Sequence, residues 1–85
     1  MDYSLKQDGF ELLVEAEKER VKEEVLSSYI SLRKKEGITQ QQIAELTGMQ
    51  RTNIVRIESG RYSPTIEVLV KLAAALDMDL EIRLV

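Results

Sequence analysis

The stretch Thr39–Gly60 constrains the fold most, because its pattern predicts two short helices joined by a tight turn. Thr39 and Gln42 have the spacing of a capping box, in which two side chains satisfy free amide groups at a helix start. Gly48 falls where the chain must reverse, a position that favours positive φ. We therefore expect one helix to begin directly after Thr39 and a second to occupy about residues 50–59.

The second predicted helix has one apolar side and one polar side. Ile54 and Ile57 lie three residues apart, so they would face the first helix. At about 100° per residue, the opposite side gathers five residues: Arg51, Thr52, Val55, Arg56 and Ser59. Arginine can donate two parallel hydrogen bonds to guanine, and threonine can offer a hydroxyl or touch a thymine methyl. This face suits a DNA major groove, where Val55 is either a methyl contact or an indifferent surface residue.

The pattern extends well beyond the two helices. Over residues 33–76 the sequence runs through RKKEGITQQQIAELTG, then MQRTNIVRIESG, then RYSPTIEVLVKLAAAL. In these segments the chain resembles the helix-turn-helix domain of the phage-repressor and Cro-like (XRE) family. The resemblance implies an all-α fold, a five-helix Cro/repressor-like helix-turn-helix bundle that binds palindromic double-stranded operator DNA as a dimer.

The same resemblance implies roles for individual residues. Two would contact phosphates: Gln40 and Arg61. Four would face bases: Gln50, Arg51, Thr52 and Arg56. Asn53 lies at the edge of that face.

The resemblance also implies an ion pair inside the bundle. In similar domains an arginine at the position of Arg33 pairs with a glutamate at the position of Glu58. The pair ties the first helix of the bundle to the second helix of the motif. We therefore expect Glu58 to be structural rather than base-reading, whereas Arg33 could do both.

The composition excludes most catalytic and metal sites. The 85 residues contain no cysteine and no histidine, so the usual zinc ligands and nucleophile or acid–base pairs cannot be assembled. We expect neither an enzyme nor a bound metal or cofactor. No apolar run approaches the roughly 20 residues that span a bilayer, and no secretion signal opens the chain. A cytoplasmic protein without membrane contact is expected.

The net charge of −3 is unusual for a DNA-binding protein, because basic side chains supply most non-specific affinity. Its distribution is uneven: residues 37–64 carry a net charge of +1, and each flank carries −2. The positive segment contains the predicted motif, and Lys34 and Lys35 lie just before it. We expect weak non-specific binding and an affinity that depends strongly on dimerisation.

The segment Phe10–Glu36 is expected to be helical, because no proline or internal glycine interrupts it and helix-favouring residues are frequent. The pattern leaves open whether it is one helix or two with a break at residues 15–20, where almost nothing is apolar. We divide the chain into an acidic helical extension, residues 1–21, a DNA-binding domain, residues 22–77, and a C-terminal segment, residues 78–85.

The extension is either a solvated addition to the bundle or a docking surface for another protein. Its candidate contact residues combine a bulky apolar cluster with an acidic neighbour: Phe10, Leu13, Val14 and Glu17. The minimal bundle does not require this cluster, and the acidic run beside it would suit a basic partner. Residues 1–9 are polar without a clear period, so we expect them to be loosely ordered or to wait for a partner.

The last eight residues alternate apolar and polar side chains, a period of two that predicts a short β-strand. Three apolar positions are assigned to dimerisation: Leu80, Ile82 and Leu84. A strand needs a ladder partner, and no other stretch of the chain resembles one. Pairing with a second copy would give a homodimer with recognition helices about one DNA turn apart. Augmentation of a partner's sheet and a frayed tail are the alternatives.

This ending narrows the resemblance. A small XRE domain with a preceding acidic helix and a terminal LEIRLV-like strand is similar to HigA-type antitoxins of toxin–antitoxin operons. Such proteins neutralise a small basic ribonuclease toxin of the RelE/HigB-like fold and repress their own promoter. The implied function is that of an antitoxin and transcriptional autorepressor. The alternative is a free-standing Cro-like repressor without a toxin partner.

Overall fold

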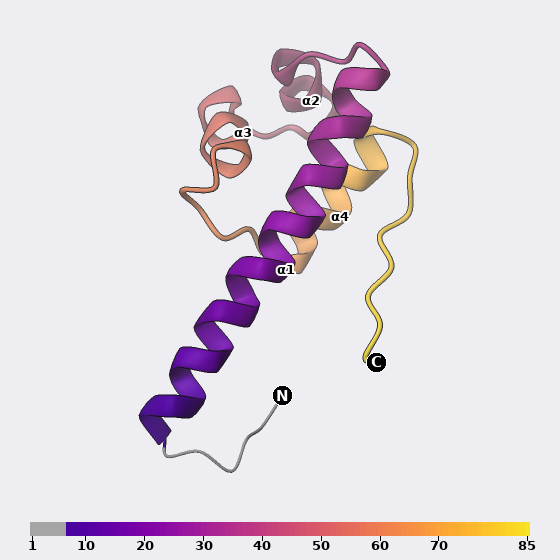
Figure 1. The fold of residues 1–85 in the computed structure, drawn as a ribbon. Coiled ribbons are helices and arrows are strands. Elements are labelled where there is room, and N and C mark those ends of the chain that lie inside the picture. Colours follow the sequence, from indigo (N-terminus) through magenta and orange to yellow (C-terminus); the bar gives the residue numbers. More distant parts are fainter. Residues whose placement is uncertain (1–6) are drawn as a thin grey trace.

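The computed structural model describes residues 7–85, and residues 1–6, with the expectations placed on them, lie outside the described part. Four helices make up the described chain: α1 (Gln7–Lys35), α2 (Gln40–Thr47), α3 (Arg51–Glu58) and α4 (Ile66–Ala75). Figure 1 shows the three short helices gathered around the C-terminal half of α1. The N-terminal half of α1 projects away from this body.

The question of one helix or two is settled by α1, a single helix of 29 residues with a length of about 43 Å. Its weakly apolar stretch is stabilised by ion pairs one turn apart. Arg20 pairs with both Glu17 and Glu24, and Lys18 lies 2.8 Å from Glu15. Each such pair contributes a few tenths of a kcal/mol to a helix. These pairs explain why the helix continues where core residues are missing. The helix also includes residues 7–9, which were expected to be loosely ordered.

The local signals of the motif are confirmed. The Thr39 hydroxyl accepts the amide of Gln42 at 3.1 Å, and the Gln42 side chain accepts the amide of Thr39 at 2.8 Å. Gly48 closes α2 with a φ of 74°, a conformation that strains residues with a Cβ. This turn sets the direction in which α3 leaves α2.

The core lies between the C-terminal half of α1 and the three short helices. Its apolar members include residues from every helix: Leu26, Tyr29, Ile43, Ala44, Ile54, Ile57, Leu72 and Leu76. Ile54 and Ile57 are fully buried, which confirms that this side of α3 faces inward. Burying one such side chain contributes about 1.5–3 kcal/mol, so the core holds α3 in one orientation.

The expectation of a five-helix bundle is wrong, because the described residues form four helices. Between α3 and α4 the chain makes bends and an extended turn instead of a further helix. Pro64 disfavours helical geometry at Ser63, and the Thr65 hydroxyl already accepts the amide of Val68 at 3.1 Å to cap α4.

The expected C-terminal β-strand is also wrong, since no strand occurs among the described residues. Asp77 takes a φ of 57° after α4, and the Met78 amide closes the helix end on the Ala73 carbonyl. The tail then runs without a ladder partner, which an isolated strand requires. Within the single chain Ile82 and Leu84 are exposed and Leu80 is half-buried, and their contact with a second copy stays a prediction.

Candidate nucleic-acid interface

The outer side of α3 is the candidate interface, and Figure 1 shows α3 at the edge of the body. The five residues placed on this side by their spacing are all exposed: Arg51, Thr52, Val55, Arg56 and Ser59. Gln50, the N-cap, is exposed too, whereas Asn53 is half-buried at the edge of the face. The fold thus brings two arginines, a threonine and small side chains to one accessible surface.

A polar hollow of about 460 Å³ adjoins the N-terminal ends of α2 and α3. Six residues line it: Arg33, Lys34, Thr39, Gln40, Gln41 and Arg51. Lys34 and Arg51 are exposed cations, and the helix N-termini add partial positive charge through their free amide groups. The hollow therefore suits an anion such as a phosphate group.

Gln40 contributes to this hollow, but its side chain also has an inward partner. It is half-buried, and its Nε2 donates to a carboxylate oxygen of Glu58 at 3.3 Å. Arg61 is exposed in the bend that follows α3. Gln40 thus lies at the first turn of α2, and Arg61 lies in the bend after α3.

The ion pair expected between Arg33 and Glu58 is confirmed, with Nη2 and Oε1 2.7 Å apart and both side chains at least nine-tenths buried. Arg33 also donates to the Ile38 carbonyl at 2.9 Å. Tyr29 donates its hydroxyl to the second Glu58 oxygen at 3.0 Å. Both carboxylate oxygens are occupied, so Glu58 is a structural residue that joins α1, α2 and α3.

The participation of Tyr29 was missed at the level of the sequence, because 29 residues separate it from Glu58. Burial and the neighbouring Glu58 carboxylate raise the pKa of Tyr29 well above its ordinary value. The phenol therefore keeps its proton at neutral pH and acts as the donor in this contact.

We expect this raised pKa to make the fold sensitive to alkali. An unfolded tyrosine loses its proton near pH 10, whereas folded Tyr29 retains it, so its contribution is complete below pH 10 and falls as the pH rises further. Urea unfolding at several pH values should show a steeper alkaline loss of unfolding free energy in the wild type than in Tyr29→Phe. Parallel pH dependences in the two proteins would contradict this coupling.

Two contacts at the end of α3 were also missed by sequence reasoning. Lys22 of α1 donates to the Gly60 carbonyl at 3.2 Å, across 38 residues of chain. The guanidinium of Arg56 lies over the ring of Tyr62, with 5.9 Å between Cζ and the ring centroid. For the contact between Arg56 and Tyr62, the only signal in the sequence was an aromatic residue, Tyr62, shortly after Gly60.

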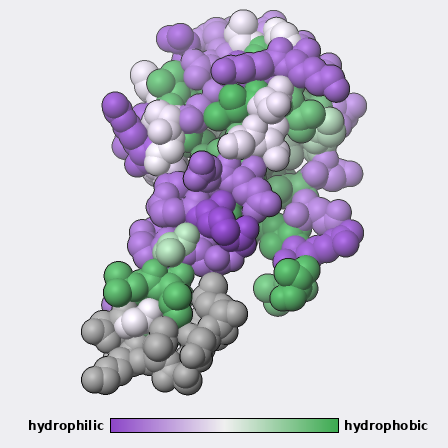
Figure 2. All heavy atoms as spheres, viewed as in Figure 1, coloured by the Kyte–Doolittle hydropathy of each residue, from purple (hydrophilic) through white to green (hydrophobic). Residues whose placement is uncertain are grey.

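The four residues assigned to a protein partner lie on the N-terminal half of α1. Phe10 and Val14 are about two-fifths exposed, and Leu13 is half-buried. Figure 2 shows apolar side chains gathered at this end of the molecule. The surface is apolar and accessible, as a docking site for another protein requires.

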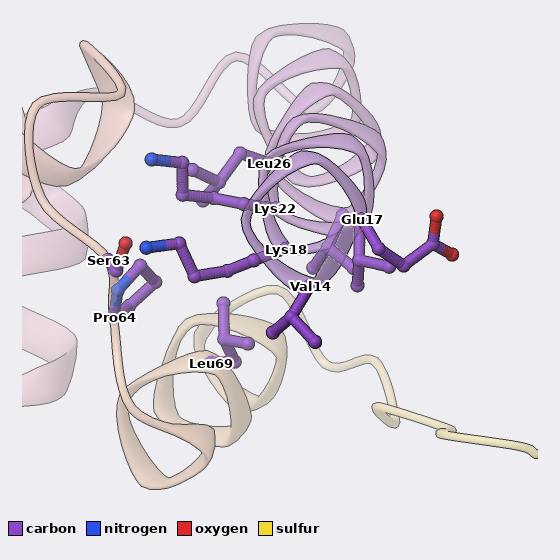
Figure 3. Close-up of a pocket in the computed structure, with 10 residues that line it drawn as sticks. Val14, Glu17, Lys18, Lys22, Leu26, Ser63, Pro64 and Leu69 are labelled. Atoms are coloured by element: carbon purple, nitrogen blue, oxygen red, sulfur yellow. The ribbon is translucent and has the colours of Figure 1, made fainter. Parts of the chain in front are cut away.

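A hollow of about 430 Å³ lies between α1 and α4 beside these residues. Val14 and Glu17 line it, together with Val21, Pro64 and Leu69. In Figure 3 the Val14 side chain lies on the Leu69 side of α1, whereas the Glu17 carboxylate points away. Of the four residues expected to contact a protein partner, Val14 and Glu17 line the hollow, and Phe10 and Leu13 do not.

Neither a metal site nor a membrane span emerges from the described residues. No cluster of acidic side chains among them could hold a metal ion. No described helix combines the length and hydropathy that crossing a bilayer requires.

Comparisons with known proteins agree with the geometry of α2 and α3. A family model described as helix-turn-helix matches residues 30–82. An uncharacterized HTH-type transcriptional regulator of Methanothermobacter thermautotrophicus is 43% identical over 44 residues, which cover 52% of this chain and 64% of that protein. A regulator of the same description from Haemophilus influenzae is 38% identical over 58 residues, covering 68% of this chain and 59% of that protein.

A phage protein is also similar. The ImmF control region 10 kDa protein of Bacillus phage phi105 is 36% identical over 50 residues, covering 59% of this chain and 56% of that protein. This chain therefore spans less than two thirds of the length of these three relatives. No solved structure matches the chain. The first two relatives are described as transcriptional regulators rather than as enzymes, in agreement with the expectation that the chain is not an enzyme.

Proposed function

We propose that this chain, which belongs to the helix-turn-helix family, is a transcriptional regulator. It would bind operator DNA with the outer side of α3. One observation carries this proposal. Ile54 and Ile57 are fully buried, so the core fixes α3 while Arg51 and Arg56 stay exposed on its other side. A short helix held rigidly with arginines outward can enter a major groove and donate to base edges.

The proposal divides the contacts into two kinds. Base edges would be contacted from the first turns of α3: Gln50, Arg51, Thr52, Asn53, Val55 and Arg56. Phosphates would be held by Gln40 and Arg61 and by backbone amide groups at the start of α2. Ser59 would stand at the far end of the face, where its hydroxyl already donates to the Arg56 carbonyl at 2.8 Å. Phosphate contacts fix the register, and base contacts give specificity.

We propose further that the chain binds as a homodimer to a palindromic site. The support is energetic. A chain with a net charge of −3 gains little from electrostatic attraction to DNA, and one α3 can contact only a few base pairs. A twofold dimer doubles both kinds of contact and matches an inverted repeat.

A gel-shift experiment on the DNA upstream of the chain's own gene tests this function. We expect one discrete complex that contains two chains and resists an excess of unrelated DNA. A shift that unrelated DNA abolishes, or no shift, would contradict operator binding.

A second function is favoured by the projecting half of α1. We propose that this surface neutralises a small basic ribonuclease toxin of the RelE/HigB-like fold, which would make the chain an antitoxin that also represses its own promoter. Leu12 and Val14 expose 72% and 42% of their surfaces, and the hollow between α1 and α4 lies beside Val14. Exposed acidic side chains such as Glu11 lie on the same half of α1 and would attract a basic partner.

We expect Val14→Lys to weaken capture of the co-encoded small basic protein about tenfold or more, because it places a cation in an apolar contact that faces a basic partner. Ala16→Lys is the matched control. Ala16 is exposed, and because it lies two residues beyond Val14 its side chain points to another side of the helix. Copurification after coexpression, followed by titration of the two proteins, gives the measurement.

The outcome separates the two candidate functions. Equal capture by the Val14 and Ala16 variants would show that the toxin surface lies elsewhere. A promoter shift by the chain alone, with no copurifying protein, would support the free-standing Cro-like repressor and leave the extension as scaffold.

A further inference from the structure

The contact between Arg56 and Tyr62 joins the outer face of α3 to the core. The Arg56 guanidinium lies over the Tyr62 ring, within the range in which a cation is attracted to the negative face of an aromatic ring. Tyr62 is half-buried and packs against the apolar core. The ring is thus packed against the core and also lies beneath the Arg56 guanidinium.

The backbone that carries Tyr62 is itself fastened. Gly60 adopts a φ of 79°, which turns the chain back after α3, and its carbonyl accepts a hydrogen bond from Lys22 of α1. The Lys22 side chain is only 14% exposed. Because the turn is tied to α1 on one side and to the core on the other, the ring of Tyr62 has a defined place beneath Arg56.

We propose that Tyr62 is a positioning residue for base recognition, and that it holds the Arg56 guanidinium in the orientation in which Arg56 donates to a base edge. This inference rests on the proposed function of α3. A free arginine side chain samples many rotamers, and restricting them on binding costs conformational entropy. A guanidinium that already rests on a fixed ring loses less freedom when it engages DNA.

The assignment predicts a local effect, not a general one. Arg51 lines the hollow beside α2, so its orientation does not depend on Tyr62. Loss of the ring should therefore relax specificity at the base pair that Arg56 contacts and leave the base pair contacted by Arg51 unchanged. A merely structural role for Tyr62 would weaken all positions together.

The test uses the full chain and a duplex enriched from a random library by the wild-type protein, together with every single-base variant of that duplex. In Tyr62→Leu the apolar bulk is retained and the aromatic face is lost, whereas Tyr62→Phe keeps the face. We expect Tyr62→Leu to reduce discrimination at the Arg56 base pair roughly threefold to tenfold. We expect Tyr62→Phe to stay close to the wild type, and Tyr62→Leu to have no further effect on specificity in an Arg56→Ala background.

Three results would overturn the assignment: unchanged discrimination in Tyr62→Leu, an equal loss at every base pair, or a loss in Tyr62→Phe as large as in Tyr62→Leu. Thermal unfolding of each variant identifies the second result as a loss of fold. Failure of the proposed function has a different signature, because wild-type protein would then enrich no duplex, or Arg56→Ala would leave discrimination intact at every position.

Discussion

Replacing Glu58 by alanine is expected to lower the free energy of unfolding by about 3–5 kcal/mol, because it leaves the buried Arg33 guanidinium without its counter-ion. The carboxylate also accepts hydrogen bonds from Tyr29 and Gln40, so three side chains lose a partner at once. Small domains have a total stability of about 0.05–0.15 kcal/mol per residue. The substitution therefore removes much of what holds the fold together, and urea unfolding followed by circular dichroism measures the loss.

Two further variants isolate the cause. Glu24→Ala removes a carboxylate that pairs with Arg20 on the exposed side of α1, and exposed pairs of this kind contribute only about 0.3–0.5 kcal/mol. The double variant Arg33→Met with Glu58→Leu removes both buried charges and should recover most of the stability. A loss below about 1 kcal/mol in Glu58→Ala would contradict the role we assign to the cluster.

Arg51→Ala and Arg56→Ala are each expected to abolish selectivity at one base pair of the operator, with a loss of about 1–3 kcal/mol in discrimination. Both side chains are exposed, so the fold should remain intact and circular dichroism should be unchanged. Competition binding with single-base variants of the operator measures the effect.

Arg83→Ala is the matched control for this pair. It removes the same charge from the exposed tail, where Arg83 pairs with Glu81 at 2.6 Å. We expect this variant to keep the wild-type order of preference among the duplexes. If Arg51→Ala and Arg56→Ala also kept that order, the outer side of α3 would not be the recognition surface.

The local parts of this fold were predictable from the sequence. The capping box at Thr39, the turn at Gly48 and the buried side of α3 depend on residues within one or two helical turns of one another. Spacing alone therefore identified which side chains of α3 would be exposed. The Arg33–Glu58 pair was expected from the resemblance to a known family rather than from spacing.

The long-range contacts were not predictable in the same way. Lys22 meets Gly60, Tyr29 meets Glu58, and Arg56 meets Tyr62 only because the core sets the angles between the helices. A residue pattern contains no information on those angles. The contacts that orient α3 were therefore visible only once the helices had been placed.

The terminal strand shows a different failure. Alternation at residues 78–85 is typical of a β-strand, but the pattern does not supply the ladder partner that a strand needs. The described chain offers none, and the tail stays irregular. In α1 the pattern left open whether residues 15–20 break the helix, and the structure has one continuous helix with exposed ion pairs along that stretch.

Selection of bound duplexes from a random library by the full wild-type chain tests the central claim most directly. We predict enrichment of an inverted repeat whose half-sites lie about one DNA turn apart, roughly 10 base pairs between centres. A pool that remains random after repeated selection would contradict the claim that α3 recognises operator DNA.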